Sequence, residues 1–254
     1  MPFFNYNNKK IFYQIKKNTN KNALLFIHGS GSTSNIWKNQ FNLDIDYDIV
    51  AIDLPSHSKS DVFSELSLEL YVNVINEFTH SFSYQSLILC GHSLGGAIAQ
   101  AYYFKHPNEI KALILCGTGG RLRVSQLILD SLKNDYDKYL NSFLLRAFYK
   151  DTPKKVIKNY KKETSNIGSK ITFQDFKICD NFDTLDKTHT IRIPCLILCG
   201  DTDYLTPAKY SQYFHEKVQK SKLVIVEKAG HMIMLEKPKE VNQAIKDFLT
   251  FKIK

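Results

Sequence analysis

The stretch LILCGHSLGGAIAQ (Leu87–Gln100) changes its pattern halfway along, and this change predicts a strand followed directly by a helix. Its first half is a short, unbroken run of apolar residues, which is typical of a strand buried on both faces of a sheet. Glycines flank Ser93 in the pattern G-x-S-x-G, as a tight strand-to-helix turn requires. Such a turn lifts the Ser93 hydroxyl out of the sheet and directs the free N–H groups of the helix toward the same place.

The pentapeptide LILCG occurs twice more, and other apolar runs resemble it. The further copies span Leu113–Gly117 and Leu196–Gly200, and the sequence diverges directly after each glycine. The other runs are Ala23–Gly29, Asp48–Pro55 and Lys222–His231. Because the copies are unequally spaced and their flanks do not match, they are not units of a solenoid. We interpret all of these runs as buried strands that end in a turn at one edge of a sheet.

Segments with helical periodicity lie between these strands. They are Leu66–Phe82, with Ser64 or Ser67 as its N-cap, then Leu94–Pro107 and Pro238–Phe251. The beginning of the chain indicates a β-hairpin around Asn7-Asn8. Alternating strands and helices predict an α/β fold with a mostly parallel central sheet flanked by helices. In such sheets the ligand binds beyond the carboxyl ends of the strands.

Polar residues at that edge suggest nucleophilic catalysis. A serine is a poor nucleophile unless a base activates it, and the base needs an acid to orient it. His231 follows the last predicted strand, and Asp201 and Asp203 both follow the third LILCG. We predict Ser93 as nucleophile, His231 as base and Asp203 as acid, because Asp203 is further past the turn and can reach sideways to the histidine. We expect Asp201 to shape the turn by bonding its own backbone.

These residues lie in motifs that resemble the α/β-hydrolase fold superfamily, in its serine-hydrolase, carboxylesterase-like branch. The similarity covers nearly the whole chain. The motifs are HGSGS (His28–Ser32), DLPSHSKSD (Asp53–Asp61), GHSLGG (Gly91–Gly96), GDTDYLTP (Gly200–Pro207) and AGHMIMLEKP (Ala229–Pro238). They resemble the oxyanion loop, the D-x-P-G-x-G-x-S turn, the nucleophile elbow, the acid loop and the histidine loop of that family.

The resemblance implies further details. The N–H groups of Ser30 and Leu94 would stabilise an oxyanion. Ser56 and Ser58 replace glycines of the family pattern, so the shape of that turn is open. The family also places a helical lid between strands six and seven. Here the lid would span 121–190, and the hydrolase core would comprise 1–120 and 191–254.

The resemblance implies a serine hydrolase that cleaves an ester or related acyl compound through an acyl-enzyme, with no cofactor and no metal. The substrate is a small acyl compound, and esters, lactones, thioesters and C–C bonds stay open. Two alternatives remain: a small-molecule receptor of the same fold with slow turnover, and a hydrolase of acyl-carrier-bound esters. The sequence identifies neither the substrate-binding residues nor the oligomeric state.

Composition and charge exclude several other classes. The net charge is +9, but no block of five or six like charges occurs and no nucleic-acid-binding motif accompanies it, so we expect no nucleic-acid partner. The first residues lack the apolar run of a signal peptide, and no apolar stretch approaches the ~18 residues that span a bilayer, so we expect neither export nor a membrane partner. The five cysteines are an odd number, which favours reduced thiols and a cytoplasmic protein.

Other histidines and cysteines have structural interpretations. We expect His28 to brace the oxyanion turn and His92 to pack, whereas His57 either lines the site or lies on a surface turn. Three cysteines, Cys90, Cys116 and Cys199, would form a row ~4.8 Å apart if the strands aligned. Because neighbouring strands point their side chains in parallel, we favour buried thiols over a metal site there.

The predicted lid leaves two questions open. Arg121, Arg123 and Arg146 either hold a carboxylate or phosphate of the substrate or form salt bridges with acidic side chains. The lid's apolar residues line an acyl pocket or pack the lid onto the sheet. They are Leu122, Leu127, Phe143, Leu144, Phe148 and Tyr149.

Overall fold

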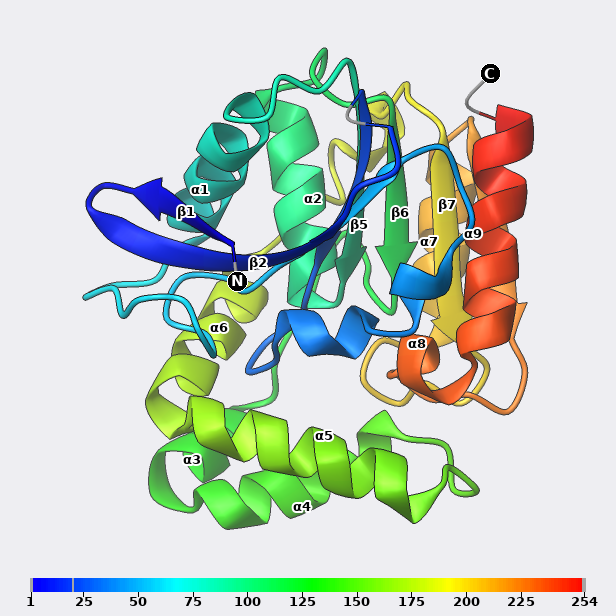
Figure 1. Cartoon of the computed structure of the whole chain (residues 1–254). Coiled ribbons are helices and arrows are strands. Elements are labelled where there is room, and N and C mark those ends of the chain that lie inside the picture. The colour runs from blue at the N-terminus through cyan, green and yellow to red at the C-terminus, as the bar shows by residue number, and fades with distance from the viewer. Residues whose placement is uncertain (1, 20, 253–254) are drawn as a thin grey trace.

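The computed structural model describes residues 2–19 and 21–252 and contains the predicted α/β architecture (Figure 1). Its sheet has eight strands among the described residues, in the order β1-β2-β4-β3-β5-β6-β7-β8. β1 and β2 are antiparallel to their neighbours, and the other pairs are parallel. The strands are β1 (Phe3–Tyr6), β2 (Lys9–Lys16), β3 (Asn22–Ile27), β4 (Asp48–Ile52), β5 (Ser86–His92), β6 (Ala112–Cys116), β7 (Cys195–Gly200) and β8 (Ser221–Val226).

The predicted hairpin at the N-terminus is confirmed. β1 and β2 pair around Asn7 and Asn8, which have φ angles of 49° and 62°. Two consecutive positive φ angles are typical of the tight turn whose twist matches that of paired strands, and asparagine tolerates this conformation better than most residues.

Helices cover both faces of the sheet. One face packs against α1 (Leu68–His80), α2 (Leu94–Lys105) and α7 (Ala208–Lys217). The other face packs against the short α8 (Ile233–Glu236) and against α9 (Pro238–Lys252). The helices agree with the predicted segments to within two residues, and the hydroxyl of Ser67 caps α1 by accepting a hydrogen bond from the Leu70 N–H at 3.0 Å.

The three LILCG copies occupy different registers, so the predicted row of cysteines is wrong. Cys90 pairs with Ile114 and Cys116 pairs with Leu198, so Cys199 lies one residue further along β7. A shift of one residue turns a side chain to the opposite face of a sheet. Cys90 and Cys116 therefore share one face, with their sulfurs 3.9 Å apart, while Cys199 points to the other face. All five cysteines are buried free thiols.

A helical insertion lies between β6 and β7, as predicted. It comprises α3 (Gln126–Asn134), α4 (Tyr136–Ala147), α5 (Lys154–Ile167) and α6 (Ser169–Asn181). Figure 1 shows these helices below the carboxyl ends of the parallel strands, where they cover the edge that carries the predicted site. Leu132, Tyr139 and Leu140 form a small core of the insertion's own. Within the described ranges, no helix is both long and apolar enough to cross a membrane.

The close contact between α2 and the sheet leads to a testable expectation. A methyl group on Gly95 would overlap the backbone carbonyl of Ile27 at the end of β3. We expect Gly95→Ala to lower the free energy of unfolding by about 3 kcal/mol, the upper end for overpacking, because backbone atoms cannot move aside as a flexible side chain can. Urea unfolding measures this loss.

The matched control is Ala101→Gly on the same helix. Ala101 is partly buried, and its replacement should cost only the helix propensity of about 1 kcal/mol. Equal losses for the two variants would contradict the close-contact explanation.

Candidate active site

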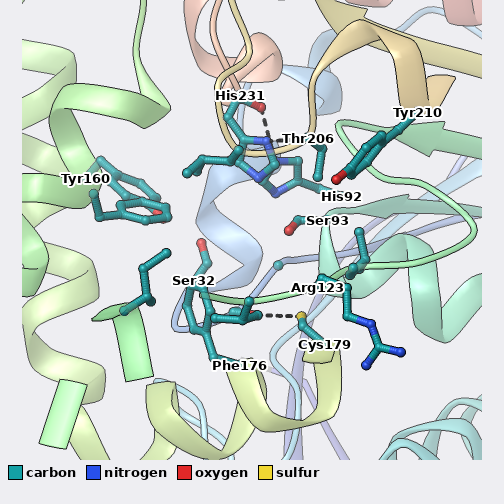
Figure 2. Close-up of a pocket in the computed structure, with 17 residues that line it drawn as sticks. Ser32, His92, Ser93, Arg123, Tyr160, Phe176, Cys179, Thr206, Tyr210 and His231 are labelled. Atoms are coloured by element: carbon teal, nitrogen blue, oxygen red, sulfur yellow. Dashed lines mark hydrogen bonds between the residues drawn. The ribbon is translucent and has the colours of Figure 1, made fainter. Parts of the chain in front are cut away.

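Ser93 lies at the turn between β5 and α2, in a strained conformation. Its backbone angles are φ 52° and ψ −116°, a combination that L-residues rarely adopt. Gly91 and Gly95 permit this turn, because a Cβ on Gly91 would overlap the carbonyl of Gly95. The turn presents the Ser93 side chain to a cavity at the carboxyl edge of the sheet (Figure 2).

His231 and Asp203 form a buried hydrogen-bonded pair beside that cavity. Nδ1 of His231 lies 2.8 Å from Oδ2 of Asp203, and only 3% of the His231 residue surface is exposed. The Thr206 hydroxyl donates to the same Oδ2, and the N–H groups of Leu205 and Thr206 donate to Oδ1. Burial favours a higher pKa for Asp203, but His231 and the Thr206 donors outweigh it and hold the pKa below its usual value. The aspartate is therefore a charged acceptor that fixes a proton on Nδ1 and leaves Nε2 available.

Asp201, the other candidate acid, is turned away from His231. Its exposed carboxylate accepts hydrogen bonds from the N–H groups of Lys228 and Ala229, at 3.0 and 3.2 Å. The prediction that Asp201 bonds its own turn is wrong, because its carboxylate oxygens bind backbone N–H groups of the segment just before His231. Asp201 therefore stabilises the relative position of the two loops.

The cavity is small and mainly apolar. It measures about 80 Å³. Ser93, His231, Gly29 and Ser30 line it, and Figure 2 shows Ser93 close to the imidazole groups of His231 and His92. Its apolar wall comes mainly from the insertion, through Leu122, Val124, Ile128, Phe143, Tyr160 and Phe176. The other predicted lid residues do not line the cavity. Leu144 and Phe148 pack in the core, the Tyr149 N–H donates to Glu236, and Leu127 is exposed on an outer groove lined mainly by α3 and α4.

The two predicted oxyanion donors, Ser30 and Leu94, belong to segments that meet at the Ser93 turn. Leu94 is the first residue of α2, so its N–H has no intrahelical acceptor, and its side chain is buried in the core. Ser30 lies in the loop after β3, and its hydroxyl is 3.4 Å from the Cys179 sulfur. A Cβ on Gly29 would lie 3.1 Å from the Cβ of Ser93, so this loop rests directly against the Ser93 turn.

His28 braces the oxyanion loop, as expected, and His92 packs beside the site. Nε2 of His28 accepts the Leu54 N–H at 3.0 Å, and burial together with His57 lowers the pKa of His28 to about 3. The His92 ring lies 4.5 Å from the His231 ring, and its Nε2 donates to the His231 carbonyl. Both histidines are therefore neutral, since burial also holds the pKa of His92 well below its usual value.

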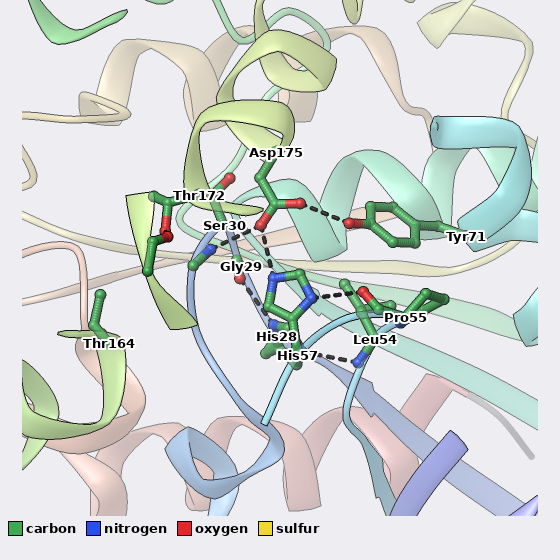
Figure 3. A network of polar contacts seen from close by, with 12 residues as sticks. His28, Gly29, Ser30, Leu54, Pro55, His57, Tyr71, Thr164, Thr172 and Asp175 are labelled. Atoms are coloured by element: carbon green, nitrogen blue, oxygen red, sulfur yellow. Dashed lines mark hydrogen bonds and ion pairs between the residues drawn. The ribbon is translucent and has the colours of Figure 1, made fainter. Parts of the chain in front are cut away.

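His57 occupies neither of the two expected places. It is fully buried, and its Nε2 lies 2.9 Å from Oδ2 of Asp175 on α6 (Figure 3). Its Nδ1 donates to the Pro55 carbonyl at 2.9 Å. Burial lowers the pKa of His57, but the charge and hydrogen bond of Asp175 outweigh this effect and raise the pKa above its ordinary value.

The sequence analysis did not identify Asp175. This aspartate lies on the buried side of α6, between Thr172 and Cys179, which are three residues before it and four residues after it. Helical spacing places all three on one stripe. A charged residue on the inner stripe of an amphipathic helix is a signal that could have identified Asp175 from the sequence. An unpaired buried charge is costly, so such a residue implies a buried partner.

Glu236 links the histidine loop to the insertion. Its Oε2 accepts the Gly230 N–H at 2.9 Å, while Oε1 accepts the Tyr149 N–H and the Thr152 hydroxyl, both at 2.6 Å. The His231 N–H in turn donates to the Ala147 carbonyl at 2.8 Å. Two links therefore hold the loop of His231 against the segment that follows α4.

The turn with Ser56 and Ser58 keeps the conformation that glycine favours. The two residues have φ angles of 68° and 50°, both in the left-handed region. The Ser56 hydroxyl accepts the Phe63 N–H at 2.9 Å, which helps to offset the strain. Although serines replace the family glycines here, the turn therefore keeps positive φ angles at both positions.

The lid arginines differ from one another. Arg121 forms a salt bridge with Asp183 at 3.3 Å, and Arg123 donates to the Asp180 carbonyl at 2.7 Å while lining the cavity. Arg146 is exposed on α4 and lines the outer groove. The described residues include no cluster of three or more His, Cys, Asp or Glu side chains suited to a metal ion.

Comparisons with known proteins agree with this fold. The family model described as "Alpha/beta hydrolase family" matches residues 24–244. A solved structure described as a thermophilic esterase is 33% identical, with a TM-score of 0.88, and the match covers 98% of this chain and 96% of that chain.

Several curated relatives carry the name pimeloyl-[acyl-carrier protein] methyl ester esterase, and two of them illustrate the similarity. The relative from Wigglesworthia glossinidia brevipalpis is 28% identical over 260 residues, covering 95% of this chain and 98% of that protein. The relative from Neisseria meningitidis serogroup A is 23% identical over 240 residues, covering 88% of this chain and 75% of that protein.

The ion pair of His57 predicts a pH-dependent contribution to stability. Because its pKa is raised in the folded protein, His57 stabilises the fold fully below its unfolded pKa of about 6.5. That contribution is lost as the pH rises through the folded-state value. We therefore expect His57→Gln to destabilise the protein most below pH 6.5 and progressively less at higher pH.

Urea unfolding of both proteins between pH 5.5 and 9 measures this difference, and the pairwise comparison cancels the opposite contributions of His28 and His92. A difference that grows with rising pH would contradict the ion pair.

Proposed function

The chain belongs to the alpha/beta hydrolase family, and on this basis we propose that it is a serine esterase acting on small acyl esters. The observation that carries the proposal is the Asp203–His231 pair, whose histidine lines the same cavity as the strained Ser93 turn. Esterase-like relatives support the same class of reaction.

In the proposed mechanism, the Ser93 hydroxyl attacks the ester carbonyl while Nε2 of His231 takes its proton. Asp203 keeps the other ring proton on Nδ1 and stabilises the imidazolium that forms. The N–H groups of Ser30 and Leu94 donate to the developing oxyanion. His231 then protonates the leaving alcohol and activates water, which releases the acid from the acyl-enzyme.

The cavity supports a short acyl group. Its volume of about 80 Å³ and its apolar wall suit a few carbon atoms rather than a long chain. The wall belongs to the proposed lid, residues 121–190, and the catalytic groups belong to the proposed core, residues 1–120 and 191–254. In this proposal the core carries out the chemistry and the lid selects the acyl group.

One second candidate has a specific observation behind it. The two curated relatives described above are named for an ester on an acyl carrier protein, and this chain carries a net charge of +9. A basic surface would steer an acidic carrier toward the site. In that case the ester would lie at the end of a carrier-bound chain rather than on a free small molecule.

A panel of p-nitrophenyl esters from acetate to dodecanoate tests the proposal. We expect multiple turnover that is highest for the short acyl groups, and we expect Ser93→Ala to abolish it. Tight binding of esters with almost no turnover would instead indicate a receptor of the same fold, and activity that survives in Ser93→Ala would contradict the assigned nucleophile.

Substitutions of Asp203 and Asp201 distinguish the proposed catalytic role from the structural role. We expect Asp203→Asn to lower kcat by ~10⁴, because the histidine then loses the acceptor that fixes its tautomer. Asp201→Asn should leave kcat nearly unchanged and lower the free energy of unfolding by about 1 kcal/mol, a typical cost of one substitution. Steady-state kinetics and urea unfolding measure the two effects, and a folded Asp201→Asn protein without activity would overturn the assignment.

Ionic strength distinguishes the two substrate classes. Hydrolysis of a small neutral ester should change little between 20 and 500 mM salt. Hydrolysis of a carrier-bound ester should slow steeply if steering matters, because salt screens exposed charges beyond ~10 Å at 0.1 M. We expect only a small dependence on salt for the natural substrate. Much higher kcat/KM on carrier-bound esters, with a steep salt dependence, would favour the second candidate.

A further inference from the structure

The carboxylate of Asp175 connects the insertion to three separate segments of the core. Oδ2 accepts the Gly31 N–H at 2.8 Å and lies 2.9 Å from Nε2 of His57, while Oδ1 accepts the Tyr71 hydroxyl at 2.7 Å. Figure 3 shows these donors converging on Asp175 from the oxyanion loop, the turn after β4 and helix α1. Asp175 itself has no exposed surface.

The charge of this group is balanced within the network. Both ring nitrogens of His57 face acceptors, the Pro55 carbonyl and the Asp175 carboxylate, so the ring is an imidazolium paired with a carboxylate. A buried carboxylate without such a partner would be strongly unfavourable. The ion pair therefore allows the fold to keep a full negative charge next to the Gly31 N–H.

The Gly31 N–H belongs to the loop that carries Ser30. Gly31 has a φ of 58°, and the Ser32 N–H donates to the Gly29 carbonyl at 3.3 Å to close the turn. Helix α6 packs so closely that a Cβ on Gly31 would lie 2.7 Å from Oγ1 of Thr172. Apart from these packing contacts, the hydrogen bond to Asp175 fixes the orientation of the peptide between Ser30 and Gly31.

We propose that Asp175 is a positioning residue for the oxyanion hole: by holding the Gly31 N–H, this carboxylate of the insertion restrains the peptide that follows Ser30, and through the Ser30 backbone the direction in which the Ser30 N–H points. This role rests on the proposed esterase function and on Ser30 as an oxyanion donor. Asp175 touches neither the substrate nor Ser93 in this mechanism. It acts through the backbone of the loop, so its loss affects the transition state more than substrate binding.

Two variants separate positioning from general stabilisation. Asp175→Ala removes the acceptor of the Gly31 N–H, whereas Tyr71→Phe removes a different donor to the same carboxylate and leaves the Gly31 bond in place. We expect Asp175→Ala to lower kcat by roughly 10- to 100-fold with little change in KM, somewhat less than the loss of a whole oxyanion donor. Tyr71→Phe should keep kcat within about threefold of the wild type, even if its Tm falls.

A transition-state analogue gives a second readout. A short-chain alkyl trifluoromethyl ketone forms a tetrahedral adduct with an active-site serine, and its affinity should fall by the same factor as kcat/KM in Asp175→Ala but not in Tyr71→Phe. If both variants lose activity in proportion to their loss of Tm, or if folded Asp175→Ala keeps the wild-type kcat, the positioning role is overturned. Should Asp175→Ala fail to fold, Asp175→Asn, which keeps the side-chain volume, should show a smaller loss of kcat in the same direction; an unchanged kcat would count against the proposal.

The two proposals fail in distinguishable ways. Ester hydrolysis by the wild type that Ser93→Ala abolishes supports the esterase function whatever Asp175 does. Amide hydrogen exchange of Ser30 and Gly31 tests the positioning without any substrate. We expect exchange at both amides to be at least tenfold faster in Asp175→Ala, or Asp175→Asn, than in Tyr71→Phe, and equal rates would overturn the positioning role even in an active enzyme.

Discussion

The close approach of the first turn of α2 to the ends of β3 and β5 is the constraint on which the rest of the site depends. No side chain fits at Gly91 or Gly95, because backbone carbonyls occupy the space on the other side. This contact forces Ser93 into its strained conformation and brings the loop after β3 against it. The position of Ser93 relative to the loop after β3 is therefore determined by backbone packing, which is less adaptable than side-chain packing.

The insertion is attached to this centre by more than apolar packing. The Ala147 carbonyl accepts the N–H groups of His231 and Met232, Glu236 accepts donors from the segment after α4, and Asp175 reaches the oxyanion loop. Each of these contacts joins the insertion to the backbone of a loop beside the cavity. Through these contacts the insertion is part of the scaffold of the site.

Local patterns explain why much of the fold was predictable from the sequence. The strand, the glycine-flanked Ser93 and the helix after it are adjacent in sequence. Asp203 and His231 likewise each follow a predicted strand by only a few residues. Asp175 was not predictable in this way, since its three donors come from segments more than 100 residues away. His57 was misjudged for the same reason, because its partner lies 118 residues further along the chain. The register of the cysteines depends on neighbouring strands and was also missed.

The repeated pentapeptide shows how little the central strands themselves specify their own alignment. Leu113 and Leu115 point to the face of α1, α2 and α7, whereas Leu196 and Leu198 of the third copy point to the face of α8 and α9. The two layers thus accept the same residues in either orientation. During folding, a one-residue slip of such a strand would bury an almost equivalent set of side chains, so the native alignment has to be enforced by what lies at the strand ends. The glycine turns and the polar loops beyond them therefore disfavour folding intermediates with a shifted register, in addition to shaping the site.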